Sequence, residues 1–243
     1  LNVNSNKKNL NNNMTQPTIL ITGANRGLGL KFTELDAQKK FNVLATCRAP
    51  QNAERLLQLA EQSDLISIYP LDVGINEEIE DLSHKIKDVP IDILINNAGI
   101  WRSSSLGSAN KQAWLESFAI NSIAPYEVIQ ALLPNIKMGG LKKVVSITSK
   151  MGSIDDNTSG GSYIYRSSKS ALNMIMRSLE NDLRSYDIST LTLHPGWVQT
   201  DMGGMNALIN DEQSVSGMIE VIDALNIKNS GRFIDYAGKH INW

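Results

Sequence analysis

Short apolar runs alternate along the chain with segments whose apolar residues recur at helical spacing. The runs are rich in Ile, Val and Leu, which is typical of strands buried on both faces. The runs that predict strands are Thr18–Thr22, Asn42–Cys47, Ile66–Leu71, Ile91–Ile95, Lys143–Thr148, Ile188–Leu193 and Arg232–Asp235. The segments that predict helices are Leu28–Lys39, Ala53–Gln62, Glu77–Lys87, Gln112–Asn135 (bent near Pro125) and Ser162–Ser185. This alternation predicts an α/β fold: a single Rossmann-type, doubly wound parallel sheet of about seven strands with helices on both faces.

The pattern shows no internal repeat and no second domain. Residues 1–13 contain seven asparagines and no apolar core of a signal peptide, so we expect a disordered leader or a non-native addition there. We expect residues 14–243 to form one domain. No apolar run approaches the roughly 20 residues that a membrane span requires, and the cytoplasm is the default compartment.

Charge and composition exclude several classes of function. The chain has 23 basic and 25 acidic residues, a net charge of −2, with no block of like charge that would suggest nucleic acid as a partner. Cys47 is the single cysteine, so an intrachain disulfide or a thiolate metal cluster is excluded. The three histidines show no ligand spacing, and we expect no metal.

A glycine-rich turn follows the first predicted strand. Its residues are Thr22, Gly23, Ala24, Asn25, Arg26, Gly27, Leu28 and Gly29. Glycine lets the backbone approach a pyrophosphate, and the N-terminus of the next helix offers unpaired N–H groups to it. A tight turn that binds no ligand would carry the same glycines. The position of this turn directly after the first strand nevertheless favours nucleotide binding.

Two arginines indicate which dinucleotide binds. NAD-binding folds usually place Asp or Glu at the end of the second strand, and this strand ends in Thr46, Cys47 and Arg48. Arg26 and Arg48 are suited to a 2′-phosphate, which favours NADP over NAD. Asp72, followed by Val73 at the end of the third strand, either holds the adenine amino group or caps the next helix.

The most informative residues for chemistry are Tyr165 and Lys169. Residues four apart stack on one face of a helix, so the ammonium is expected near the phenol. A nearby positive charge lowers the pKa of a phenol from its usual value of about 10. Such a tyrosine can donate a proton to a carbonyl oxygen. Tyr163 is a competitor, but only Tyr165 has a lysine four residues later.

Together these motifs resemble the short-chain dehydrogenase/reductase family, and within it the C-factor and sniffer-like carbonyl reductases. The resemblance extends from Thr18 to Trp243 and implies that the domain is a dinucleotide-binding oxidoreductase. The matching positions beyond the phosphate turn are Asn96, Asn97, Ala98, Gly99, Asn121, Ser149, Tyr165, Lys169, Pro195, Gly196, Trp197, Val198, Gln199 and Thr200.

The resemblance implies roles for these residues. Asn121, Ser149, Tyr165 and Lys169 would form the catalytic set, with Lys169 also on the nicotinamide ribose and Asn121 holding a water. Ser149 lies further before Tyr165 than is common, and Ser146 and Ser153 are its competitors. The cofactor would contact Asn97, Ala98 and Gly99, and Pro195, Gly196, Val198 and Thr200.

The expected function is NADPH-dependent reduction of an apolar aldehyde or ketone to the alcohol. The pocket walls would come from Ile100, Trp101, Trp197, Met202 and Met205, with Gly203 and Gly204 allowing a mobile lid. A cofactor-binding signalling protein with little turnover is the alternative. The family commonly pairs the Gln112–Asn135 and Ser162–Ser185 helices across a two-fold axis, so a homodimer or homotetramer is expected.

Overall fold

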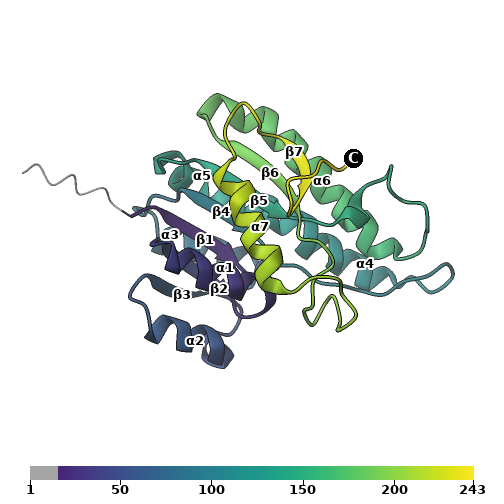
Figure 1. The fold of residues 1–243 in the computed structure, drawn as a ribbon, viewed down its shortest axis with the longest axis horizontal. Helices are drawn as coiled ribbons and strands as arrows, with labels where there is room; N and C mark the ends of the chain where they lie inside the picture. Colours follow the sequence, from purple (N-terminus) through teal and green to yellow (C-terminus); the bar gives the residue numbers. More distant parts are fainter. Residues whose placement is uncertain (1–15) are drawn as a thin grey trace, which may run out of the picture.

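The computed structural model describes residues 16–243, and the leader expected over residues 1–13 lies outside them. A seven-stranded parallel sheet runs through the molecule in the order β3-β2-β1-β4-β5-β6-β7 (Figure 1). The strands are β1 (Thr18–Thr22), β2 (Asn42–Cys47), β3 (Ile66–Pro70), β4 (Ile93–Asn96), β5 (Lys143–Ile147), β6 (Ser189–His194) and β7 (Arg232–Asp235). The doubly wound fold expected from the sequence is confirmed, and the strand ends differ from the expected ones by two residues or fewer.

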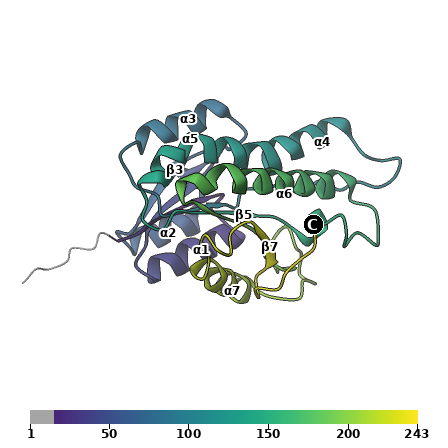
Figure 2. The ribbon, with the colours of Figure 1, turned by 90° about the horizontal axis from the view of Figure 1, so that it is seen from above.

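Helices cover both faces of the sheet. The helices are α1 (Gly27–Gln38), α2 (Glu54–Glu61), α3 (Asn76–Lys85), α4 (Lys111–Phe118), α5 (Ala124–Met138), α6 (Tyr163–Leu183) and α7 (Asp211–Asp223). Figure 2 shows α3, α4, α5 and α6 on one side of the sheet and α1 and α7 on the other. Because both faces are covered, strands such as β1 and β5 are buried at every position instead of alternating between buried and exposed residues.

Each face of the sheet has its own apolar core. One core joins α1, α2 and α7 to the sheet and contains Phe32, Leu56 and Met218, each fully buried. The other joins α3, α5 and α6 to the opposite face and contains Leu94, Leu132 and Met176. Strands β1 and β4 are central, and residues of both contribute to both cores.

Helix α7 was not expected from the sequence, although a local signal for it exists. Asn210 is its N-cap, and the side-chain oxygen of Asn210 accepts a hydrogen bond from Gln213 N at 2.8 Å. Apolar residues then recur at helical spacing: Val215, Met218, Ile219 and Ile222. Gly217 lies inside the helix because a Cβ there would come within 2.5 Å of Tyr236 O.

The long helix expected over Gln112–Asn135 is interrupted rather than merely bent. A π-helical turn, η2 (Ala119–Ile123), separates α4 from α5, and Ala124 N–H bonds to Ala119 O, five residues back. Pro125 follows directly and has no N–H to donate, so the regular α-helical pattern cannot run through this point. The interruption places Asn121 at the break.

The order of the strands determines where a ligand can lie. The chain winds from β1 outward to β2 and β3, then returns to β4 on the other side of β1. In open α/β sheets, ligands bind beyond the carboxyl ends of the strands where the winding direction reverses. Here that point lies between β1 and β4, next to the glycine-rich turn.

Candidate active site

A cleft of about 660 Å³ opens at the carboxyl ends of the strands. Residues from the phosphate turn, from the ends of β2 to β5, from α6 and from the segment after β6 line it. Predicted site residues in its lining are Gly23, Asn25, Arg26, Gly27, Leu28, Arg48, Asp72, Val73, Asn97, Ala98, Gly99, Tyr165, Lys169, Pro195 and Thr200. Residues more than a hundred positions apart therefore meet in one cleft.

The phosphate turn is held in shape by the end of β4. Asn97 Nδ2 donates to Thr22 O at 2.9 Å and to Gly23 O at 3.0 Å. The Thr22 hydroxyl accepts hydrogen bonds from the backbone N–H groups of Asn97 and Ala98. A Cβ on Gly29 would lie 2.2 Å from Gly23 O, so only glycine allows helix α1 to pack this closely beneath the turn.

The two arginines proposed for the phosphate differ in their surroundings. Arg26 Nη1 lies 2.7 Å from Asp201 Oδ2 across the cleft. Arg48 is exposed beside Cys47, the last residue of β2, and within residues 16–243 its side chain makes no hydrogen bond or ion pair. No carboxylate stands at the end of β2, so none at that strand end would repel a phosphate near Arg48.

Asp72 takes part in the local turn before α3. Its Oδ1 accepts a hydrogen bond from Gly74 N at 2.9 Å, and its backbone N–H donates to Glu78 Oε2 at 2.6 Å. The N-cap of α3 is Ile75, so Asp72 does not cap that helix. Its side chain still lines the cleft, where it could also accept from an amino group.

Tyr165 lies in the first turn of α6 and is only 7% exposed. The Trp101 ring packs on it with the centroids 4.5 Å apart and the planes tilted by 51°. Burial raises the pKa of Tyr165 to about 12, although a hydrogen bond with Ser149 opposes the rise. The pKa in this structure is therefore raised, whereas a lowered pKa was expected from the sequence.

Lys169 explains this difference. It lies on the same face of α6 as Tyr165, as expected, but its Nζ donates to Ile147 O at 2.9 Å and is 5.9 Å from the centre of the phenol ring. Burial lowers the pKa of Lys169 to about 8. The expectation that Lys169 lowers the pKa of Tyr165 is wrong for this structure, because burial raises that pKa and Ser149, not Lys169, is the group that opposes the rise.

Among the three candidate serines, Ser149 is the one that reaches Tyr165. Ser149 follows β5; its hydroxyl accepts from Met151 N at 3.1 Å and lies close enough to the phenol to oppose the rise in the pKa of Tyr165. Ser146 points into the core and donates to Met176 Sδ. The Ser153 hydroxyl bonds to Trp243 O at 3.3 Å, away from the cleft.

Two residues that sequence reasoning did not single out for this role hold the Ser149 segment against α6. Thr148 Oγ1 donates to Asn173 Oδ1 at 2.7 Å, and Asn173 Nδ2 donates to Gly152 O at 3.2 Å. A Cβ on Gly152 would lie 2.8 Å from the backbone of Lys169, so this segment packs directly on the helix. The only signal in the sequence was Asn173, a buried polar residue on the inner face of α6.

Asn121 is fully buried, and its side chain is already bonded within the protein. Its Oδ1 accepts from Ile100 N at 2.8 Å, and its Nδ2 donates to Ile100 O at 2.9 Å and to Ser168 Oγ at 3.0 Å. A Cβ on Gly99 would lie 3.2 Å from Asn121 Oδ1 and 3.7 Å from Lys169 Nζ. Asn121 thus fixes the strand end beside Lys169.

Five of the predicted site residues are not among those that line the cleft in this structure: Gly29, Asn121, Ser149, Gly196 and Val198. Val198 is buried and pairs with Ile209 in an isolated β-bridge. Gly196 has φ of +87°, and a Cβ there would meet Ile209 and Tyr236. These two residues shape the segment after β6 and do not face the cleft.

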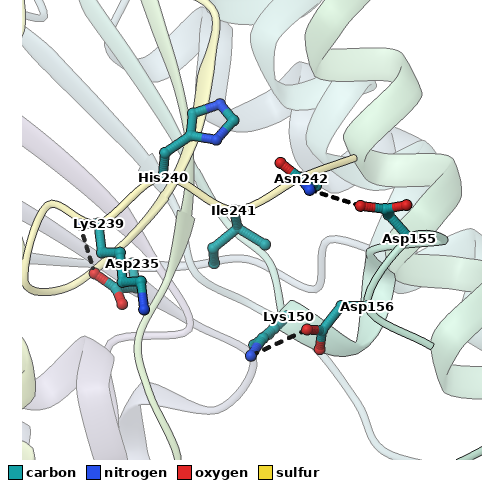
Figure 3. Close-up of a pocket in the computed structure, with 8 residues that line it drawn as sticks. All are labelled: Lys150, Asp155, Asp156, Asp235, Lys239, His240, Ile241 and Asn242. Atoms are coloured by element: carbon teal, nitrogen blue, oxygen red, sulfur yellow. Dashed lines mark hydrogen bonds and ion pairs between the residues drawn. The ribbon is translucent and has the colours of Figure 1, made fainter. Parts of the chain in front are cut away.

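A second hollow, of about 290 Å³, lies near the C-terminal segment (Figure 3). Several of its charged side chains are bonded to neighbours in its own lining: Lys150 pairs with Asp156 at 3.1 Å, and Asn242 Nδ2 donates to Asp155 at 2.6 Å. It contains neither the phosphate turn nor Tyr165. Across residues 16–243, no group of three or more His, Cys, Asp or Glu side chains is placed to hold a metal ion, and no helix there has the length and apolar character of a membrane span.

A parallel doubly wound sheet with a phosphate turn at its switch point and a Tyr/Lys pair in the same cleft defines a dinucleotide-dependent oxidoreductase. The sequence profile described as "short chain dehydrogenase" matches residues 17–208. The chain belongs to this family.

Relatives narrow the placement within the family. The chain is 48% identical over 157 residues to C-signal of Myxococcus xanthus, covering 63% of this chain and 93% of the relative. The carbonyl reductase Sniffer of D. melanogaster superposes with a TM-score of 0.90 at 34% identity, covering 94% of this chain and all of the other. An NADPH-bound carbonyl reductase from chicken fatty liver gives 0.88 at 35% identity, covering 94% and 99%. The resemblance to C-factor and sniffer-like reductases is thereby confirmed.

Proposed function

We propose that this protein is an NADPH-dependent oxidoreductase that reduces an apolar aldehyde or ketone to the alcohol, with Tyr165 as the proton donor. The observation that carries the proposal is the buried Tyr165 phenol in the same cleft as the phosphate turn and Arg48. The chicken reductase, which is bound to NADPH and matches over almost the whole chain, supports it.

The residues present fit NADPH. Gly23 and Gly29 let the turn pack tightly against Ala98 and helix α1. The N-terminus of α1 then presents backbone N–H groups that can bind a phosphate. Arg48, with Arg26, would hold the 2′-phosphate by charge-assisted hydrogen bonds. When bound, NADPH supplies the hydride that reaches the carbonyl carbon.

The protein supplies the proton and stabilises the charge that develops on oxygen. With its pKa raised to about 12, Tyr165 carries its proton near neutral pH, which is the state a donor requires. The Ser149 hydroxyl would share the same carbonyl oxygen and stabilise the forming alkoxide. Trp101 covers one side of the phenol and limits the access of water.

Lys169 would serve the cofactor more than the phenol. One N–H of its ammonium is bonded to Ile147 O, which leaves two N–H donors for the ribose hydroxyls. Asn121 would act through position, because its side chain fixes Ile100 and Gly99 beside Lys169. A water held near this break in the helix would link Lys169 to solvent.

The substrate is proposed to be a small to medium carbonyl compound with an apolar body. Ile100 and Met202 line the cleft, and Trp101 packs on the tyrosine. Arg102 and Glu116 also line it, but they form an ion pair at 2.8 Å and so neutralise one another. Met205 is 88% exposed and Trp197 51% exposed, so neither is part of an enclosed wall in this structure.

The test is NADPH oxidation with aromatic aldehydes and diketones against sugars and carboxylated ketones. Tyr165→Phe should lower kcat by on the order of 10²–10⁴-fold while NADPH still binds, because only the proton donor is removed. Tyr163→Phe is the matched control, since Tyr163 lies in the same turn of α6 but is not in the cleft lining. Normal turnover in Tyr165→Phe, or faster turnover of charged and polyhydroxylated substrates, would contradict the proposal.

A cofactor-binding signalling protein with little turnover is the second candidate, favoured by the 48% identity to C-signal. NADPH binding with no turnover across the substrate panel would support this reading. The arrangement of Tyr165, Ser149 and Lys169 favours the enzyme, because a binding protein has no need of a buried proton donor.

Self-association is proposed through helices α4, α5 and α6. Most of the apolar stripe expected on α6 is buried in the monomer, including Ile164, Leu172 and Met176, but Met174 is 67% exposed. Leu115 on α4 and Tyr126 on α5 are also exposed. We expect a homodimer or homotetramer in the cytoplasm, and a monomeric mass by light scattering at micromolar concentration would contradict the assembly.

A further inference from the structure

The phosphate turn is bonded across the cleft to the loop that follows Pro195 and Gly196. Arg26 Nη1 and Asp201 Oδ2 are 2.7 Å apart, although the residues are separated by 175 positions in the sequence. Beside this ion pair, a Cβ on Gly27 would lie 3.6 Å from Thr200 Cγ2. All four residues line the cleft, so the two segments meet across it.

The loop that carries Asp201 maintains its own shape. Its ends are joined where Gln199 N donates to Ile209 O at 2.9 Å and Val198 pairs with Ile209. Within it, Gly204 N donates to Thr200 O at 2.8 Å, and a Cβ on Gly203 would lie 1.9 Å from Val198 O. The two glycines therefore form a tight turn inside the loop rather than a hinge at its base. Asp201 is held at a defined place opposite the phosphate turn.

Arg48 provides an internal comparison. Both arginines line the cleft and both have been proposed for the 2′-phosphate, but only Arg26 is bonded to a carboxylate. In the part of the chain that the structure describes, Arg48 has no ion pair. A ligand phosphate can therefore meet Arg48 directly, whereas it can engage Arg26 only by replacing Asp201.

We propose that Asp201 competes with the 2′-phosphate of NADPH for Arg26 and so lowers the affinity of the protein for NADPH without lowering that for NADH. The inference rests on the proposed function. A 2′-phosphate carries a charge near −2 at neutral pH and several acceptor oxygens, so it is a stronger partner for a guanidinium than one carboxylate. NADH has no group that displaces Asp201, and with NADH the ion pair remains.

The size of the effect follows from the exposure of the pair. The side chains are 64% and 77% exposed, and ion pairs this exposed form only about one to four times as often as they break. A ligand that needs the broken state loses affinity by one plus that ratio, because only the broken fraction of the protein can bind it. Removing the carboxylate should thus tighten NADPH binding about two- to five-fold.

The test uses 2′-AMP, which carries the 2′-phosphate and adenosine but no pyrophosphate or nicotinamide. Its Kd is measured by calorimetry beside those of NADPH and NADH, for the unmodified protein and Asp201→Asn. We expect Asp201→Asn to tighten 2′-AMP and NADPH about two- to five-fold and to leave NADH unchanged. The gain should persist in an Arg48→Ala background and disappear in an Arg26→Ala background.

The backgrounds separate this mechanism from others. A gain that persists in Arg26→Ala would show that Asp201 repels the phosphate directly, and a loss of affinity in Asp201→Asn would show that Asp201 helps to close over the cofactor. Either result would overturn the competition. If the unmodified protein bound neither NADPH nor 2′-AMP, the proposed function would fail together with this inference. NADPH binding with no change in Asp201→Asn would overturn the inference alone.

Discussion

Asp36 on α1 is a buried carboxyl group whose charge should limit the stability of the protein. The side chain is 4% exposed, and its Oδ2 has no hydrogen-bond partner within the described residues. Burial raises the pKa of Asp36 from 3.8 to about 7, against the opposing charge of Lys39 and together with the like charge of Asp223. Lys39 does not pair with Asp36, because its Nζ lies 2.5 Å from Asp223.

The pH dependence follows from this raised pKa. Between about pH 4 and pH 7 the unfolded chain has lost the proton that folded Asp36 keeps, so the free energy of unfolding falls as pH rises. Above about pH 7 the full free-energy cost of the buried Asp36 charge is present. At about 1.36 kcal/mol per unit of pKa shift, this cost is at most about 4 kcal/mol. Asp36→Asn should recover on the order of 2–4 kcal/mol at about pH 8 and almost nothing near pH 4.

Urea unfolding of both proteins at pH values from about 4 to about 8 measures this difference. The matched control is Asp64→Asn, which removes the same charge from an exposed position and should change stability by under about 0.5 kcal/mol at any pH. If Asp36→Asn were as stable as the unmodified protein at about pH 8, or less stable, the carboxyl group would have a partner that compensates its burial, and the reasoning would be refuted.

Three further predictions concern the cleft. Gly29→Ala should lower the free energy of unfolding, measured in urea, by about 1–3 kcal/mol and abolish NADPH binding, because its Cβ would lie 2.2 Å from Gly23 O. Gly140→Ala is the control that should change neither, since a Cβ there lies 3.4 Å from its nearest neighbour. NADPH affinity should fall by up to about tenfold per pH unit as pH rises through about 8, because Lys169 loses its proton there. An affinity that does not change with pH would mean that the ammonium does not contact the cofactor. Trp101→Ala should raise KM for aromatic carbonyls about 3- to 10-fold with little change for small aliphatic ones, and equal changes for both classes would argue against a substrate contact.

Much of the fold and the phosphate turn could be predicted from the sequence, because their signals are local. Strands buried on both faces must be apolar throughout, and β1 and β2 are visible for that reason. The turn from Gly23 to Gly29 follows a strand and opens a helix, and the structure places it there. Helix α7 could have been predicted as well, because its N-cap residue and its helical spacing of apolar residues are both local signals.

The chemistry of the catalytic pair was only partly available from the sequence. The spacing of Tyr165 and Lys169 places both on one face of α6, and that much is local. The pKa of each depends on what surrounds it: Ile147 O draws the ammonium away, and burial raises the pKa of the phenol. No spacing rule contains these contacts, because they come from strand β5 and from packing across the cleft.

The sequence by itself determined which elements form, the order in which they alternate and which residue types stand at the strand ends. Only the tertiary structure decided that Asp201 faces Arg26, that Asn121 is bonded to Ile100, and that Val198 pairs with Ile209. The physical reason is range. Hydrophobic period and turn chemistry act over a few neighbouring residues, whereas ion pairing, burial and hydrogen bonding in the cleft join residues up to 175 positions apart, which meet only after the sheet has formed.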